Sequence, residues 1–276
     1  KTLTEKKRIP STWDRQEQQD QDLRKNRDNM NPVDCHSHLE FDKFDEGREE
    51  VIERAKKRLE FVVSVGCSLE KNRETLSIAE KHPDFILPNL GLHPTYTEAF
   101  TDLGKIKEMI REENPNAVGE IGLDHYHVED EKTRDRQRKV FRELLDLAEE
   151  LGNPVNIHSR EAEQEVLNIL DNYSINNVLI HCFNGSVSQA KEVVNQGFYI
   201  GVTTQVLYSD KIQNLVRNID LENIVLETDS PFLYRGERNE PVNVIESAEK
   251  IAEIKEVESE EVVEITTQNA RRIFLE

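Results

Sequence analysis

The chain has 276 residues, of which 33% are charged and 36% hydrophobic, with a formal net charge of −19 at pH 7. Like-charge repulsion argues against non-specific adhesion to nucleic acid or anionic lipid. No apolar run approaches the ~20 residues that span a bilayer and no signal peptide is recognisable, so we expect a cytoplasmic protein without a membrane segment.

The first 31 residues differ in composition from the rest of the chain. They carry eight Lys or Arg against six Asp or Glu and almost no large apolar side chains. Such a segment cannot bury enough apolar surface to fold by itself, so we expect a disordered extension at 1–31 and one folded domain over 32–276. The three cysteines are odd in number and lack zinc-finger spacing, which favours free, buried thiols in a reducing compartment.

Eight short runs rich in β-formers follow one another along the domain. They lie at 33–39, 61–67, 85–94, 117–124, 154–160, 177–183, 197–202 and 223–231. Segments with helical periodicity separate them; in the longest, 134–152, apolar residues line one face and Gly152 ends the pattern. Two further helical segments, 241–254 and 259–274, follow the eighth run.

Alternation of strands and helices predicts parallel pairing with right-handed crossovers. Eight strands in about 240 residues favour an α/β fold of the (β/α)8 TIM-barrel type. A doubly wound dinucleotide-binding sheet would carry G-x-G-x-x-G after its first strand, and that motif is absent there. The last two helices would then cover the eighth strand.

Polar residues stand at the ends of most predicted strands, which meet at one mouth in such a barrel. They are His36, His38, His93, Glu120, His158, His181 and Asp229. A lone strand histidine is more often structural than a ligand, but a carboxylate inside an apolar strand needs a cation or another strong partner. That requirement applies to Glu120, Glu227 and Asp229. We expect His82 to be exposed and His125 and His127 to lie in an exposed loop.

Four imidazoles and two carboxylates exceed the needs of one tetrahedral zinc site and suit two divalent cations. In this hypothesis Glu120 bridges them. His36, His38 and Asp229 hold one cation, and His158 and His181 hold the other. Asp229 would also orient the attacking water and accept its proton. Mixed nitrogen and oxygen ligands are compatible with Mg, Mn or Zn, and no organic cofactor is needed.

Such a site supports hydrolysis of a phosphodiester, an ester or an amide, and two cations favour phosphoryl transfer. Arg160, and Arg235 with Arg238, could hold a phosphate or form ordinary surface salt bridges. Asp34 lies on the face of His36 and His38, deeper in the strand, and is expected to support the ligands. Glu227 is a candidate for the same role.

The residues also resemble the TatD-type metal-dependent deoxyribonucleases, a family of amidohydrolase-like barrels. The matching pieces run in order through 33–275: "DCHSHL", "GLHP", "AVGEIGLD", "NIHSREA", "HCFNGS", "LETDSPFL", "RNEP" and "TTQNARRIF". Glu143 stands where the family often has Gln, and the stretch from "DSPFL" to "NEP" is shorter than in many members.

The resemblance implies a nuclease with the same six ligands, often a 3′–5′ exonuclease acting on single-stranded DNA or 3′ ends. It also implies that His93 contacts substrate or supports the ligands. Some relatives remove D-amino acids from tRNA, so a D-aminoacyl-tRNA deacylase is the alternative enzyme. A catalytically inactive binding barrel is the alternative of another class, against which the complete ligand set argues. A monomer is the default expectation.

Overall fold

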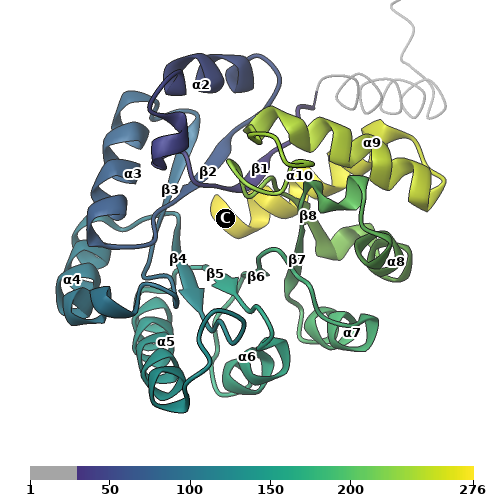
Figure 1. The fold of residues 1–276 in the computed structure, drawn as a ribbon. Coiled ribbons are helices and arrows are strands. Elements are labelled where there is room, and N and C mark those ends of the chain that lie inside the picture. The colour runs from purple at the N-terminus through teal and green to yellow at the C-terminus, as the bar shows by residue number, and fades with distance from the viewer. Residues whose placement is uncertain (1–29) are drawn as a thin grey trace, which may run out of the picture.

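The computed structural model describes residues 30–276, and most of the expected extension at 1–31 lies outside that part of the chain. Eight parallel strands pair in chain order, β1 to β8, and form a ring that is nearly closed (Figure 1). A bridge between Ser37 and Ser230 joins the ends of β1 and β8. The strands are β1 (Asp34–Ser37), β2 (Val62–Val65), β3 (Ile86–Leu90), β4 (Ala117–Gly122), β5 (Val155–His158), β6 (Val178–Ile180), β7 (Tyr199–Val202) and β8 (Ile224–Leu226). The predicted (β/α)8 barrel is confirmed.

Helices surround the ring of strands, as Figure 1 shows. They are α2 (Arg48–Lys56), α3 (Leu69–Lys81), α4 (Leu103–Glu113), α5 (Glu131–Leu151), α6 (Glu163–Leu170), α7 (Val187–Asn195), α8 (Asp210–Asn218), α9 (Val244–Lys255) and α10 (Ser259–Phe274). Short 3-10 turns lie at η1 (Asp42–Phe44), η2 (Thr97–Asp102), η3 (Thr204–Leu207), η4 (Leu221–Asn223) and η5 (Pro241–Asn243).

Helix α5 shows how local sequence sets the bounds of an element. Its N-cap residue, Asp130, accepts a hydrogen bond from the backbone N–H of Thr133 at 2.9 Å, so the helix begins three residues before the predicted 134. At the other end Gly152 adopts a left-handed conformation with φ 72°, which stops the helix where the sequence predicts. The apolar face between these caps packs on the barrel.

The last helix closes one end of the barrel. Ala270, Ile273 and Phe274 of α10 join a small buried cluster with Val33 and Phe61, which lie at the N-terminal ends of β1 and β2. The side chain of Asn116, just before β4, donates to the carbonyl of Phe274 at 3.1 Å. Because α10 covers the N-terminal ends of the strands, the polar residues at their C-terminal ends are left at the open mouth.

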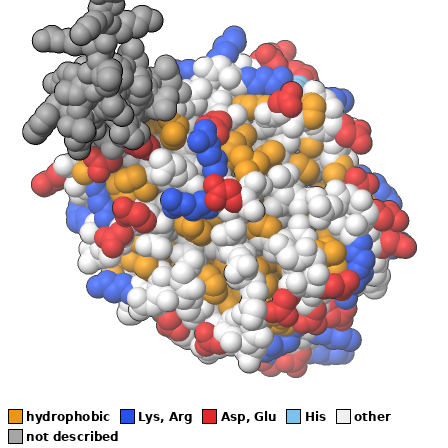
Figure 2. Space-filling model, turned by 180° about the vertical axis from the view of Figure 1, so that it is seen from behind, with side chains coloured by type: hydrophobic (Ala, Val, Ile, Leu, Met, Phe, Trp, Pro, Cys, Tyr) orange, Lys and Arg blue, Asp and Glu red, His pale blue; other side chains and the backbone are white. Residues whose placement is uncertain are grey.

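The surface of the described residues is mixed in charge. In Figure 2, acidic and basic side chains are interspersed around the rim of the face shown, with hydrophobic side chains between them toward its middle. Among residues 30–276 no helix is both long and apolar enough to cross a bilayer.

Two expectations need correction. The strands are shorter than predicted, so His38, His181 and Asp229 lie just beyond the ends of β1, β6 and β8. The expectation that His82 is exposed is wrong: only 9% of it is accessible. Its ring lies 3.2 Å from Glu49 and 3.0 Å from Lys56 Nζ, both of α2, because the end of α3 packs beside that helix.

Candidate metal centre

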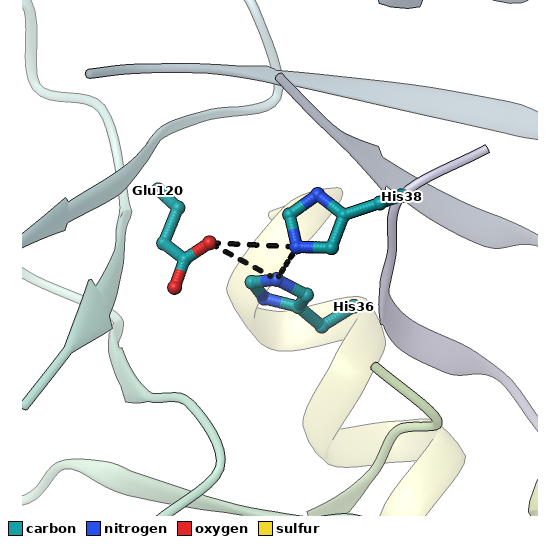
Figure 3. Close-up of side chains that lie close together, drawn as sticks. All are labelled: His36, His38 and Glu120. Carbon is teal, nitrogen blue, oxygen red and sulfur yellow. Dashed lines mark hydrogen bonds and ion pairs between the residues drawn. The ribbon is translucent and has the colours of Figure 1, made fainter. Parts of the chain in front are cut away.

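Three side chains from two opposite strands converge in the mouth of the barrel. His36 of β1 and His38 just after it point their Nε2 atoms at each other, 3.3 Å apart. Oε2 of Glu120, from β4, lies 3.5 Å from one of these nitrogens and 3.6 Å from the other, as Figure 3 shows. Two imidazole nitrogens and a carboxylate oxygen thus face one small space, an arrangement that suits a shared cation.

The second oxygen of Glu120 faces a different group of imidazoles. Oε1 lies 2.8 Å from Nδ1 of His158 and 3.4 Å from Nε2 of His93. His181 is farther away, with Nε2 at 3.8 Å. One fully enclosed carboxylate therefore lies between five histidines, and each of its oxygens faces its own set.

Asp229 and His181 lie next to the group formed by His36, His38 and Oε2 of Glu120. Oδ1 of Asp229 lies 3.5 Å from Nε2 of His38, 3.8 Å from that of His181 and 3.9 Å from that of His36. The His181 ring stacks on the His36 ring with centroids 3.5 Å apart. In the sequence hypothesis His181 pairs with His158, but here it groups with His36 and Asp229, while His158 groups with His93 and Glu120.

Asp124 is a buried carboxylate that the sequence analysis did not single out. Its Oδ2 lies 2.9 Å from Nε2 of His158, whose Nδ1 contacts Glu120. The carboxylate also accepts the backbone N–H of His127 at 2.7 Å. The His158 ring is thereby held between two carboxylates. The sequence signal was the "GLD" that ends the fourth predicted run, 117–124, where Asp124 follows a buried, apolar stretch.

Glu40 and Asn156 were also missed, and both contact the histidines of β1. The Glu40 carboxylate is buried and lies 3.3 Å from Nδ1 of His38, which is also 2.9 Å from the carbonyl of Val65. Oδ1 of Asn156, in β5, lies 3.2 Å from Nδ1 of His36. These contacts to the far ring nitrogens leave both Nε2 atoms directed into the site.

The two supporting carboxylates predicted from the sequence lie behind the site. Asp34 accepts hydrogen bonds from the backbone N–H and the hydroxyl of Thr228, at 2.8 and 2.6 Å, and so ties β1 to the chain after β8. Glu227 accepts the backbone N–H of Cys182 at 2.6 Å, and its other oxygen lies 3.1 Å from Nδ1 of His181.

The electrostatics keep the central carboxylates charged. Burial alone would raise the pKa of Glu120, but the surrounding imidazoles outweigh it and hold that pKa well below its usual range. The pKa of Asp229 is lowered in the same way, with His38 and His181 opposing the effect of burial. Burial would lower the pKa of His158, yet its hydrogen bonds to Asp124 and Glu120 raise it to about 9. Glu120 and Asp229 therefore stay ionised at neutral pH, which is the form of a carboxylate that binds a cation.

A cavity of about 490 Å³ opens over these side chains. Its walls include Phe41, Tyr96, His93, Arg160 and Phe232. Arg160 lines this cavity and is exposed, so a phosphate could reach it, and its guanidinium lies 3.9 Å from the centroid of the Tyr126 ring. Arg238 instead forms a salt bridge with Glu240 at 3.2 Å, which is the second of the two roles expected for it from the sequence.

The three cysteines and the two loop histidines lie close to where the sequence predicts. Cys35 and Cys67 are buried free thiols as expected, while Cys182 is partly accessible. His127 is exposed as expected, and His125 lies 3.5 Å from Glu165 in a partly covered position.

A (β/α)8 barrel whose mouth holds a buried carboxylate among five imidazoles has the donor set of a metal-dependent hydrolase. The family model described as "TatD related DNase" matches residues 33–275. The chain belongs to this family. It is therefore an enzyme, a metal-dependent hydrolase that acts on ester bonds.

Curated relatives and solved structures agree with this assignment. A metal-dependent hydrolase of Bacillus subtilis, YabD, is 38% identical over 252 residues, covering 87% of this chain and 98% of its own. The human deoxyribonuclease TATDN3 is 35% identical, covering 88% of this chain and 94% of its own. The crystal structure of the Escherichia coli TatD homolog YJJV superposes with a TM-score of 0.79 at 26% identity, covering 88% of this chain and 97% of that one.

Proposed function

We propose that this enzyme is a two-metal deoxyribonuclease that cleaves phosphodiester bonds in single-stranded DNA from the 3′ end. The observation that carries the proposal is the position of Glu120, whose two oxygens face different groups of histidines. A carboxylate with one oxygen facing each of two donor sets would suit two neighbouring cations. The named deoxyribonuclease activity of the human relative supports DNA as the substrate.

In this proposal six residues hold two divalent cations, either Mg, Mn or Zn. They are His36, His38, Glu120, His158, His181 and Asp229. The donor set fits such ions because carboxylate suits Mg and Mn and imidazole suits Zn, and because Glu120 and Asp229 are charged at neutral pH. When bound, the cations supply positive charge that polarises the phosphate and lowers the pKa of water.

The remaining steps fall to the protein's own side chains. Asp229 lies at the open side of the cluster with 16% of its side chain accessible, so it can accept the proton of the attacking water. Its backbone N–H donates to the carbonyl of His36 at 2.9 Å, which holds it in place. Arg160 stands at the mouth, where it can bind the phosphate and oppose its charge. His93, whose ring is 2.7 Å from the Thr95 hydroxyl, lines the same cavity.

The test is hydrolysis of a labelled single-stranded oligodeoxynucleotide by the full chain, with and without a chelator. A parallel assay with a D-aminoacyl-tRNA distinguishes the alternative enzyme. We expect metal-dependent release of nucleotides from the 3′ end. Metal-dependent deacylation without cleavage of DNA would refute the proposal. The free cysteines support a reducing compartment, and we propose that the enzyme works as a cytoplasmic monomer.

A further inference from the structure

A second groove adjoins the catalytic cavity. It has a volume of about 540 Å³ and is lined by Lys43, Tyr208 and residues 231–237; we call it the adjoining groove. Phe232 and Leu233 belong to the walls of both the groove and the catalytic cavity. The groove and the catalytic cavity therefore meet at these two residues.

The groove combines aromatic rings with unpaired cations. Lys43 Nζ lies 4.6 Å from the centroid of the Phe232 ring. Among the residues that the structure describes, neither Lys43 nor Arg235 has a carboxylate within 4.0 Å, although the chain has a net charge of −19. Glu237 is the acidic residue in the lining. Two free cations beside aromatic rings are the elements with which proteins bind single-stranded nucleic acid.

Tyr208 is held ready to stack against a planar group. Its hydroxyl donates to the carbonyl of Leu233 at 3.2 Å, yet 46% of the residue is accessible. Burial raises the pKa of the Tyr208 phenol, and the nearby positive charge of Arg235 opposes that rise. The ring is thus anchored at its polar end, exposed along its body and close to a cation.

Arg235 is fixed by an unusual turn. Arg235 and Gly236 have φ values of 46° and 88°, and the N–H of Glu237 donates to the carbonyl of Tyr234 at 2.7 Å. Two positive φ values at the centre of a hydrogen-bonded turn define a type I′ turn, in which an arginine is disfavoured. Such a conformation persists where the neighbouring structure imposes it, and it occurs often at ligand sites.

We propose that the adjoining groove binds the nucleotide next to the scissile phosphodiester of single-stranded DNA. Tyr208 stacks on its base, and Lys43 and Arg235 bind its phosphates. The bases of a duplex are already stacked on one another, so this contact selects for a single strand. The inference rests on the proposed function, because it takes the metal centre as the place of cleavage.

The main test compares Tyr208→Ala and Tyr208→Phe in the full-length enzyme. The substrates are a single-stranded oligodeoxynucleotide and the small diester bis(p-nitrophenyl) phosphate, which is too short to reach the groove. Loss of one stacked base corresponds to about a 5- to 150-fold rise in KM. We expect a rise in this range for the oligonucleotide with Tyr208→Ala, at least about fivefold larger than for the small diester. Tyr208→Phe keeps the ring and should restore KM.

The charges are tested by fluorescence anisotropy with the labelled oligonucleotide in chelator, where no cleavage occurs. Arg235→Gln and Lys43→Gln should each reduce the slope of log K against log salt by about 0.7. Arg111→Gln removes the same charge from the outer helix α4, where Arg111 pairs with Glu150, and should leave the slope unchanged. For the Tyr208→Ala experiment, the matched control is Tyr173→Ala, which removes a tyrosine from the chain after α6.

Equal losses on both substrates with Tyr208→Ala, or no rescue by Tyr208→Phe, would overturn the inference, since Tyr208 would then only support the loop. An unchanged KM would overturn it as well while leaving the nuclease proposal intact. Absence of DNA cleavage by the wild-type enzyme would instead refute the proposed function, and the anisotropy measurement would still decide whether the groove binds a single strand.

Discussion

Nε2 of His158 lies 2.9 Å from Oδ2 of Asp124, while the other nitrogen of the same ring lies 2.8 Å from Glu120. The ring therefore has one carboxylate on each side. An imidazole that binds metal is commonly oriented by a carboxylate at its second nitrogen. Asp124 is the residue in position to set how His158 faces the centre.

Replacing Asp124 by Asn should weaken the enzyme without unfolding it. The amide keeps the shape of the side chain but removes the charge that orients His158, and losses of about 10- to 100-fold are typical for such supporting groups. Metal affinity by titration and kcat on the oligonucleotide measure the effect. Asp171→Asn makes the same chemical change at the outer end of α6 and should leave both values unchanged. Wild-type metal affinity in Asp124→Asn would show that His158 needs no such support.

Asp229→Asn should abolish most hydrolysis while the fold is retained. The amide cannot accept the proton of the attacking water, and the change removes one of the two carboxylates among the six proposed ligands. Single-turnover rates measure the loss, and circular dichroism with urea unfolding monitors the fold. A variant that turns over at the wild-type rate would remove Asp229 from the mechanism.

The sequence predicts the barrel and the seven polar residues at its mouth, because strand ends and buried carboxylates leave a local pattern. Glu40 was predictable too, since it continues the every-second-residue spacing of Asp34, His36 and His38, although β1 itself ends at Ser37. Asp124 was harder to find: it lies two residues beyond Gly122, which ends β4 with a φ of 145°, and hydrophobic periodicity does not reveal such a departure from strand geometry.

Other features depend on contacts between distant segments. His82 is buried because α2 packs against the end of α3, and the pattern of α3 alone contains no information on that neighbour. The grouping of His181 with His36 depends on ring orientations that are set by Glu227 and Asn156 behind them. Sequence spacing places these residues at one mouth but leaves their partners undetermined.

Metal removal should lower thermal stability as well as activity. Ions that bind only the folded protein stabilise it by about 2.7 kcal/mol at 100 times their Kd, which corresponds to roughly 5–10 °C in a domain of this size. We expect a chelator to lower Tm by that amount and Mg, Mn or Zn to restore it. Glu120→Gln, which disrupts both groups of donors, should show a much smaller shift on adding metal. An equal shift in this variant would place the stabilising ion elsewhere.

Gly201→Ala should disturb the site through Glu227. A Cβ at Gly201 would lie 2.5 Å from the carboxylate of Glu227, which contacts His181. Forcing atoms into such a packed position costs about 1–3 kcal/mol. Urea unfolding of the metal-free protein should show this loss, accompanied by reduced activity.

Gly104→Ala is the matched control, because a Cβ there meets no atom within 4 Å and the residue lies in α4. Alanine in a helix is favoured over glycine, so this variant should gain a few tenths to about 1 kcal/mol. Gly201→Ala with wild-type stability would mean that Glu227 moves freely, contrary to its buried position.

The stability of the metal-free protein should fall as pH rises through the pKa of His158. Burial would lower this pKa, but the bonds to Asp124 and Glu120 raise it to about 9, above the ~6.5 of an unfolded histidine. A group whose pKa is raised by folding contributes its full stabilisation below pH ~6.5 and loses it as pH approaches 9. Unfolding free energies between pH 6 and 9.5 in chelator measure this loss, on the order of 3 kcal/mol.

Asp124→Asn separates His158 from the other histidines in the same experiment. The variant removes the carboxylate hydrogen bond that contributes most to raising the pKa of His158, so its stability should depend less on pH over this window. Titration of Asp124 itself does not contribute to the difference between the two pH profiles, because its lowered pKa lies far below pH 6. Identical pH profiles for wild type and variant would show that the His158 to Asp124 contact contributes nothing to folding between pH 6 and 9.5.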